Sequence, residues 1–345
     1  MAAAWTRHYD PEVPPSLEPY PARTLVDFVR DSARTDPRAP AIFFKGATLS
    51  NSRLDRLSDG FAASLADAGI RKGDRVALVL PNCPQFLIAE LGAWKAGATV
   101  LPLNPLYTAG ELRDPLVNAD VRLVVTLTPF YERLKEIRSD TRVKRIIATN
   151  IKEYLPPLLR LLFTLFKEKK GGHRIRLEPG DRWFQDCVKT SARRGVNRTP
   201  GPSPDDPAIM LMSGGTTGMP KMVVGPHRCL VAAGVQLARW LHAPRDAPQD
   251  IALVPLPLFH VYACVGAQSH SIVSRTPMAL VPNPRDIADL LKTIGTVRPT
   301  LFSAVPALFI ALLNDSRVKN RSVDFSSIRA CGWRQSPRSQ IRVQL

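Results

Sequence analysis

Residues 211–222 read LMSGGTTGMPKM, a stretch that gathers glycines, hydroxyls, a proline and a lysine behind an apolar run. Gly214, Gly215 and Gly218 permit positive φ angles and let phosphate oxygens come close to the backbone. The preceding strand is expected to end near Ser213, where backbone N–H groups lose their ladder partners and become available to an anion. The stretch is therefore interpreted as a cradle for a polyphosphate.

Side chains of the same loop add donors and charge. Ser213, Thr216 and Thr217 supply hydroxyls. Lys221 supplies a mobile positive charge, and Pro220 stiffens its approach. A Walker A loop is excluded because that motif requires Gly-Lys followed by Ser or Thr, whereas two residues separate glycine from lysine here. A flexible surface loop rich in glycine and threonine is the alternative.

On both sides of this loop, apolar runs alternate with helical patterns. The runs expected to form strands are RVALVL (75–80), ATVLPL (98–103), RLVVT (122–126), RIIAT (145–149), AIMLMS (208–213), IALVPL (251–256), MALVP (278–282) and TLFSAV (300–305). The helices expected between and around them cover about 54–68, 85–95, 110–118, 130–138, 228–241, 262–273, 286–294 and 307–313. This alternation favours an α/β fold with two βα arrays, about 40–150 and 206–330, whose sheets are mostly parallel. Asn51 or Ser52 is expected to cap the first of these helices.

A middle segment, about 151–205, breaks the alternation. It contains YLPPLLRLLFTLFKEKK (154–170), which is too short to span a bilayer because a spanning helix needs about 20 apolar residues. A buried helix is one interpretation. The other is an interfacial helix whose Lys167, Lys169 and Lys170 lie at lipid headgroups.

Composition narrows the class of partner. A formal net charge of +17 suits an anionic partner, yet no zinc-finger spacing, RNP-like motif or long Lys/Arg tract favours nucleic acid. The five cysteines are scattered and never in CxxC spacing, which favours neither a metal site nor a disulfide framework. Residues 1–20 form a proline-rich irregular lead rather than a secretory signal. We expect a cytoplasmic protein with peripheral membrane contact through residues 154–170.

Taken together, these stretches resemble the acyl-adenylate-forming (AMP-binding) ligases, the superfamily of acyl-CoA synthetases, luciferases and peptide-synthetase adenylation domains. Residues 213–221 match its signature Ser/Thr-Gly-Thr-Thr-Gly-x-Pro-Lys with one extra glycine. GIRKGDRVALVLPNCPQFLIAELGAWKAGATVLPLNPLYTAGEL (69–112) and LVPLPLFHVYA (253–263) resemble the long-chain fatty acyl-CoA synthetase branch. The similarity runs from about Tyr20 to Cys331 and implies the fold of the large N-terminal domain of acyl-CoA synthetases.

The resemblance implies a two-step reaction. A fatty acid carboxylate attacks the α-phosphate of Mg²⁺-bound ATP to give acyl-AMP and pyrophosphate, and the thiol of coenzyme A then displaces AMP. Thr216, Thr217 and the loop glycines Gly214, Gly215 and Gly218 would hold the β- and γ-phosphates, and Lys221 would screen the leaving pyrophosphate.

Residues of the second array extend these implied roles. His260 would stand beside the acyl carboxylate and the nucleotide, although a lone histidine is often only packed or solvated. Trp240, Phe259, Tyr262 and Val265 could line an acyl pocket, but apolar residues at helical spacing are usually core.

The resemblance fails near the end of the sequence. From Cys331 the family pattern Gly-Ser-Gly-Gly-Ala-Pro is replaced by GWRQSPRSQIRVQL, and Met222 replaces the glycine that usually follows the signature lysine. Residues 331–345 are interpreted as an out-of-frame basic tail or, alternatively, as a divergent tail that binds an anionic surface. Residues 21–330 then form an incomplete AMP-binding N-terminal domain without the small C-terminal lid domain. We expect little or no ligase activity, and a non-catalytic nucleotide- or lipid-binding protein is the alternative.

Overall fold

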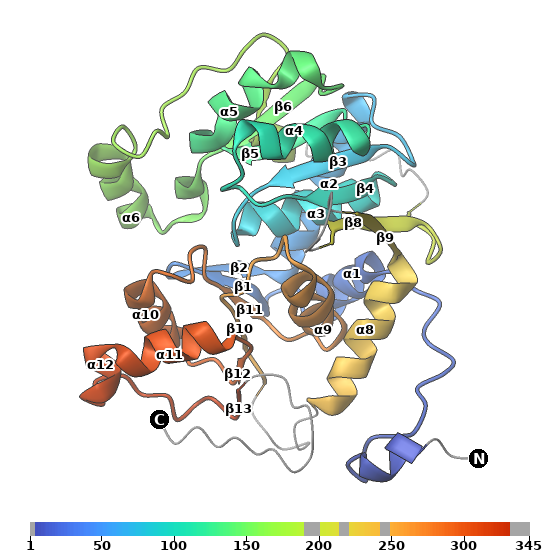
Figure 1. The fold of residues 1–345 in the computed structure, drawn as a ribbon, viewed down its shortest axis with the longest axis vertical. Coiled ribbons are helices and arrows are strands. Elements are labelled where there is room, and N and C mark those ends of the chain that lie inside the picture. Colours follow the sequence, from blue (N-terminus) through green and yellow to red (C-terminus); the bar gives the residue numbers. More distant parts are fainter. Residues whose placement is uncertain (1–3, 190–200, 214–220, 242–248, 332–345) are drawn as a thin grey trace.

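The computed structural model describes residues 4–189, 201–213, 221–241 and 249–331, and within them two mostly parallel sheets carry the core (Figure 1). One sheet is ordered β7 (Arg182–Trp183), β6 (Arg145–Thr149), β5 (Leu123–Leu127), β3 (Arg75–Val79), β4 (Thr99–Pro102), β8 (Pro207–Met212) and β9 (Met222–Pro226). The other is ordered β13 (Ala330–Cys331), β12 (Leu301–Phe302), β10 (Ala252–Val254), β11 (Met278–Leu280), β1 (Pro40–Phe44) and β2 (Ala47–Ser50). Among the strands that the structure describes, only the pairs β8–β9 and β1–β2 run antiparallel. The predicted α/β class is confirmed.

The helices pack over these sheets and between them. They are α1 (Leu25–Thr35), α2 (Asn51–Asp67), α3 (Pro84–Lys95), α4 (Ala109–Asn118), α5 (Tyr131–Glu136), α6 (Pro157–Leu162), α7 (Phe184–Lys189), α8 (His227–Trp240), α9 (Ser269–Val273), α10 (Ile287–Val297), α11 (Pro306–Asn314) and α12 (Ser316–Lys319). Short 3-10 helices cover Ala4–His8, Thr128–Phe130, Arg138–Asp140 and Ile151–Tyr154, and π-helical turns cover Phe163–Lys167 and Tyr262–Gln268. Each predicted helix is present, with ends displaced by a few residues.

The cap of α2 differs from the prediction. Ser50 caps the helix, and its Oγ accepts a hydrogen bond from the Arg53 amide at 3.4 Å. Asn51 is already the first helical residue, and its side chain instead donates to the Asp36 carbonyl at 3.0 Å. The cap therefore lies one residue before the predicted positions, because the end of β2 leads directly into the helix.

Each half of the chain completes the sheet of the other half. β1, from the start of the chain, pairs with β11, with Ile42 opposite Met278. β8, from the second half, pairs with β4, with Val100 opposite Ile209. The two arrays expected along the sequence therefore do not correspond to two separate sheets. An antiparallel hairpin from the other half closes one edge of each sheet.

Helix α3 organises the interior. Every residue of α3 is buried, including Lys95, whose Nζ lies 2.5 Å from Asp55 and 2.8 Å from Asp59. The Trp94 indole donates to the Ala208 carbonyl at 2.8 Å, which fixes the start of β8. Since β8 leads into the glycine-rich stretch of the sequence, α3 sets the position from which that stretch departs.

The segment after β6 is exposed. Leu158, Leu165 and Phe166 of α6 and the π-helical turn that follows it are 67%, 65% and 66% exposed. The buried-helix interpretation of residues 154–170 is therefore wrong, because these side chains have no core to pack against. Across the described ranges, no helix is long and apolar enough to cross a membrane.

Candidate functional site

The predicted phosphate loop lies between two paired strands. Ser213 and Lys221, which we call the loop neck, follow β8 and precede β9. The Ser213 amide donates to the Lys221 carbonyl at 2.8 Å, and the Lys221 amide donates to the Ser213 Oγ at 3.0 Å. The hairpin therefore uses the Ser213 amide, and the loop amides predicted to bind an anion after the end of β8 lie outside the described residues. The Lys221 side chain is exposed.

The rest of the predicted loop is not described. Gly214, Gly215, Thr216, Thr217 and Gly218 lie outside the described residues, so their phosphate-binding roles stay predictions. The described neck nevertheless shows where the loop departs. It leaves the carboxyl end of β8, a strand parallel to its neighbour β4, and ligands of open α/β sheets commonly bind at this edge.

One buried side chain joins the carboxyl ends of the two sheets. Asn82 follows β3 and is 2% exposed. Its Nδ2 donates to the carbonyls of Val254 and Leu256 at 2.9 and 2.8 Å, and its Oδ1 accepts from the Leu258 amide at 2.8 Å. All three bonds are made to the last residue of β10 and to the segment that follows it. Sequence reasoning missed this residue, because an asparagine after a strand is usually a turn residue.

Asn82 holds the segment that leads to His260 against the end of β3, in the sheet that also carries the loop neck. β8 lies two strands from β3, which is about 10 Å at normal strand spacing. His260 follows Leu258 by two residues and is therefore within about 7 Å of it along the chain. The loop neck follows β8 and His260 follows β10, strands of the two sheets that Asn82 joins.

His260 lies just before the π-helical turn Tyr262–Gln268. Its carbonyl accepts from the amides of Ala263 and Cys264 at 3.1 and 3.0 Å. Its Nδ1 accepts from the Tyr262 amide at 3.3 Å, so Nε2 carries the proton of the neutral ring. The imidazole is exposed rather than packed in the core. A donor at Nε2 suits a carboxylate or phosphate oxygen.

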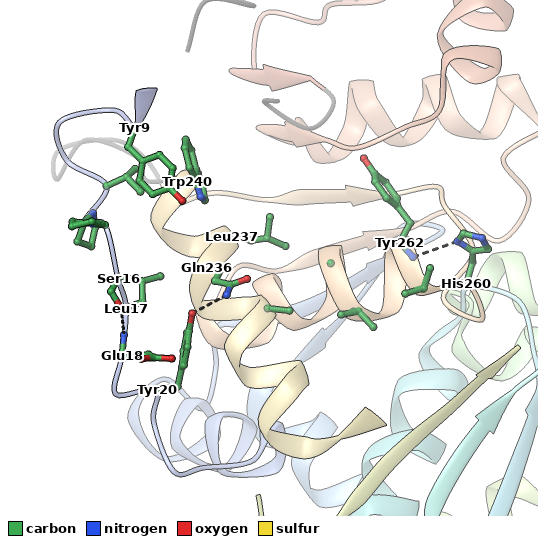
Figure 2. A pocket seen from close by; sticks show the side chains of 17 residues that line it. Tyr9, Ser16, Leu17, Glu18, Tyr20, Gln236, Leu237, Trp240, His260 and Tyr262 are labelled. Atoms are coloured by element: carbon green, nitrogen blue, oxygen red, sulfur yellow. Dashed lines mark hydrogen bonds between the residues drawn. The ribbon is translucent and has the colours of Figure 1, made fainter. Parts of the chain in front are cut away.

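A cavity of about 810 Å³ extends from His260 along α8 (Figure 2). Its walls come from three segments, the first of which is far from the other two in sequence: Tyr9, Val13–Glu18 and Tyr20; Ala233, Gln236, Leu237 and Trp240 of α8; and His260, Val261, Tyr262, Val265 and Gly266. The volume is typical of a small-molecule site, and most of the wall is apolar. An elongated apolar ligand with a polar end near His260 would fit this shape.

The cavity gathers most of the residues predicted for an acyl pocket. Trp240, Tyr262 and Val265 line it together with His260, whereas Phe259 is not part of its wall. Burial raises the pKa of Tyr262 to about 12, so its hydroxyl stays neutral at physiological pH.

A buried acid lies behind the π-helical turn that forms one wall of the cavity. Glu90 of α3 is fully buried and accepts a hydrogen bond from Gln268 Nε2 at 2.5 Å. Burial raises the pKa of Glu90 to about 8, and the hydrogen bond from Gln268 only partly opposes this rise. The sequence signal was a single acid in the otherwise apolar run FLIAELGAW (86–94). Glu90 contacts the turn and does not line the cavity.

Comparisons with known proteins agree on one family. The family model described as "AMP-binding enzyme" matches residues 29–342. A long-chain-fatty-acid–CoA ligase of Bacillus subtilis (strain 168) is 33% identical over 330 residues, which cover 95% of this chain and 58% of that protein. The chain therefore spans little more than half the length of this relative.

Solved structures share the fold. A long-chain-fatty-acid-CoA ligase (FadD1) from Archaeoglobus fulgidus superposes with a TM-score of 0.73 at 20% identity, over 92% of this chain and 59% of that one. The anthranilate CoA ligase AuaEII in complex with anthranoyl-AMP superposes with a TM-score of 0.72 at 20% identity, over 90% of this chain and 54% of that one. At these identities the likeness concerns the fold alone.

Proposed function

The chain belongs to the AMP-binding enzyme family, and from this premise we propose that it takes part in the ATP-dependent ligation of a fatty acid to coenzyme A. Acyl-CoA ligases of this family use ATP with Mg²⁺ and coenzyme A. In the first step a carboxylate oxygen bonds to the α-phosphorus of ATP, and the bond from that phosphorus to the leaving pyrophosphate breaks. In the second step the coenzyme A sulfur bonds to the acyl carbon, and AMP leaves.

The observation that carries the proposal is the apolar cavity that opens at His260. A fatty acid in this cavity would place its carboxylate near the edge where the loop neck lies, because Asn82 joins the two sheets there. Lys221 is exposed at that edge and fits a polyphosphate. The chain's own residues would thus hold two anions next to each other, which is the main requirement of the first step.

A further question is how Mg²⁺ would enter the site. Among the described residues, no group of three or more His, Cys, Asp or Glu side chains is placed to hold a metal ion. We propose that Mg²⁺ enters bound to the nucleotide, since acyl-CoA ligases of this family use ATP with Mg²⁺. The cation would neutralise the phosphates, and Lys221 would add a second positive charge.

An exchange assay tests the proposal. Labelled pyrophosphate should be exchanged into ATP only when a fatty acid is present, because the first step is reversible. Nucleotide binding without exchange would instead support the alternative, a non-catalytic nucleotide- or lipid-binding protein. Exchange that needs no fatty acid would contradict the proposed substrate. Lys221→Ala is the matched negative control.

We further propose that α6 and the π-helical turn after it contact an anionic membrane surface. Leu158, Leu161, Leu162, Leu165 and Phe166 are all exposed and follow the three- and four-residue steps of one helix face. The cations Lys167, Lys169 and Lys170 follow directly and are exposed. An apolar face next to a group of cations is complementary to acyl chains below negatively charged headgroups.

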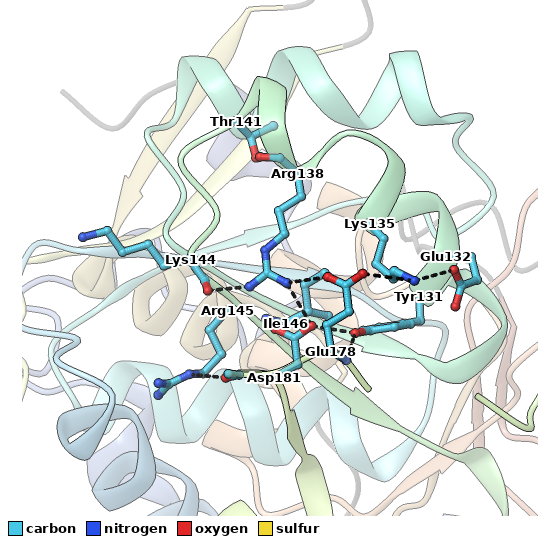
Figure 3. A network of polar contacts seen from close by, with 11 residues as sticks. Tyr131, Glu132, Lys135, Arg138, Thr141, Lys144, Arg145, Ile146, Glu178 and Asp181 are labelled. Carbon is cyan, nitrogen blue, oxygen red and sulfur yellow. Dashed lines mark hydrogen bonds and ion pairs between the residues drawn. The ribbon is translucent and has the colours of Figure 1, made fainter. Parts of the chain in front are cut away.

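Hydrogen bonds fix α6 and the π-helical turn after it to the rest of the protein, so the exposed apolar face has a defined position. Where the chain returns to the sheet, Asp181 accepts hydrogen bonds from Tyr131 Oη at 2.6 Å, the Ile146 amide at 2.8 Å and Arg138 at 3.0 Å (Figure 3). On the other side of the segment, Glu168 accepts from Asn150 at 3.1 Å. The apolar face can therefore meet a bilayer without disturbing the fold.

Vesicle sedimentation tests this contact. The protein should sediment with vesicles that contain an anionic phospholipid more than with neutral ones, and salt should weaken the binding. The variant Leu165→Glu/Phe166→Glu should lose most of the sedimentation. Val117→Glu, which changes an exposed apolar residue of α4, is the control. Equal sedimentation of the double variant and the wild type would overturn the membrane proposal.

A further inference from the structure

The outer wall of the cavity is the N-terminal strap, which we define as residues 9–20. Eight of the seventeen residues that line the cavity belong to it. Four prolines lie in the strap and fix φ at their positions, so this wall yields little when a ligand presses against it. The sequence pattern predicted only an irregular lead here, yet the strap encloses space instead of lying free.

Two contacts fasten the strap to one face of α8. Gln236 Nε2 donates to the Tyr20 hydroxyl at 2.7 Å. The rings of Tyr9 and Trp240 meet edge to face, with centroids 5.1 Å apart and planes at 71°. Gln236 and Trp240 are one helical turn apart, so the two ends of the strap are held on a single rigid element.

Between these contacts, apolar strap residues form part of the cavity wall. Val13 is 8% exposed and Leu17 is half-buried, and both line the cavity. Figure 2 shows Leu17 on the opposite side of the cavity from His260. The lining residues of α8 run from Ala233 to Trp240, a distance of about 10 Å along the helix. A chain that starts at His260 and follows α8 therefore runs toward the strap.

We propose that the N-terminal strap sets the acyl chain length that the site accepts, with Leu17 as a specificity-determining residue. The inference rests on the proposed function, since it takes the cavity ligand to be a fatty acid. Each methylene that finds apolar contact should improve affinity about fourfold. Beyond the length at which the terminal methyl reaches the strap, further methylenes should add nothing or clash.

Displacement of a fluorescent fatty acid by saturated acids from octanoate to stearate measures this limit without requiring catalysis. Leu17→Trp should weaken binding of the longest acids about tenfold or more, while the shortest acids change less than about twofold. Leu17→Ala should shift the preferred length upward. Glu12→Trp changes an exposed strap residue outside the cavity wall and is the matched control. Tyr20→Phe removes only the hydrogen bond to Gln236 and should flatten the dependence on length while keeping the fold.

The outcomes distinguish a failure of the proposed function from a failure of the role proposed for the strap. A wild-type protein that binds no fatty acid of any length would overturn the proposed function and this inference with it. Binding with a length preference that Leu17→Trp, Leu17→Ala and Tyr20→Phe all leave unchanged would overturn this inference alone. An equal loss at every length in Leu17→Trp would show that the strap only supports the fold, and would also overturn it.

Discussion

The two ends of the candidate site are built in opposite ways. The loop neck is one hairpin, in which a backbone hydrogen bond and the Ser213 hydroxyl pair Ser213 with Lys221, and the Lys221 side chain presents a charge to solvent. The cavity is mostly apolar, and it is lined by the N-terminal strap and by two segments that lie more than two hundred residues later in the chain. Asn82 joins the two. The polar end therefore depends on charge placed by local geometry, and the apolar end depends on packing between distant parts of the chain.

The largest effect should come from removing the link. Asn82→Ala removes the side-chain partner of the Val254 and Leu256 carbonyls and of the Leu258 amide, although the Val254 carbonyl keeps a bond from the Val281 amide at 3.2 Å. We expect a loss of about 3 kcal/mol in the free energy of unfolding, measured in urea, and weaker binding at both ends of the site. Asn51→Ala, which removes one exposed hydrogen bond, should cost less than about 1 kcal/mol. Unfolding at the same urea concentration in both variants would show that the two ends do not share a buried joint.

The free energy of unfolding should depend on pH through Glu90, which lies behind the wall of the cavity. The folded-state pKa of Glu90 is raised to about 8 from 4.5, so the folded state holds a proton that the unfolded state releases between these values. The stability from this group is fully present below pH 4.5 and is lost as pH rises through 8. Glu90→Gln removes this dependence, so the wild type should lose on the order of 2 kcal/mol relative to the variant between pH 6 and pH 8. Parallel pH curves in urea unfolding would contradict the raised pKa.

Lys221→Ala should affect only the polar end. Loss of one cation next to phosphate should weaken ATP binding by about 1.5 kcal/mol, or roughly tenfold, in a calorimetric titration. Fatty acid affinity should stay unchanged. Lys319→Ala removes an equally exposed lysine of α12 and serves as the control. An ATP affinity that matches this control would move the phosphates away from the loop neck.

Trp240→Ala should affect only the apolar end, and by the smallest amount. It removes one wall of the cavity and the edge-to-face contact with Tyr9. Fatty acid affinity should fall by about 1 kcal/mol, or roughly fivefold, in the displacement assay. Trp240→Phe keeps an aromatic ring against Tyr9 and should retain most of the affinity. A matching fall in ATP affinity would show that the two ends are not independent.

Much of the fold was predictable because its strands are buried on both faces. Runs such as RVALVL (75–80) and RLVVT (122–126) are continuous and apolar for that reason, and they coincide with β3 and β5. Pairing was not predictable in the same way. Nothing local to β1 indicates that its partner is β11, and the antiparallel return of β9 after the loop has no period of its own. Register between distant strands depends on the whole sheet.

The residues of the candidate site also differ in whether local sequence was enough to predict them. Ser213 and Lys221 were found because their chemistry is contained in one short stretch of sequence. Asn82 and Leu17 were missed, because their roles come from what they meet far away in sequence. His260 stands between these cases, since its motif was recognised but its exposure at the mouth of a cavity needed coordinates.

The exchange of strands between the two sheets also has a consequence during synthesis. β1 can pair with its parallel partner only after Met278, which lies opposite Ile42 and about 230 residues after it, has been synthesised. At about 5–20 residues per second, a nascent chain carries the unpaired side of β1 for tens of seconds on the ribosome. β2 covers only one side of that strand. The ribosome-bound intermediate should therefore be the species most in need of a chaperone, and slower translation between these two strands should lower the yield of folded protein.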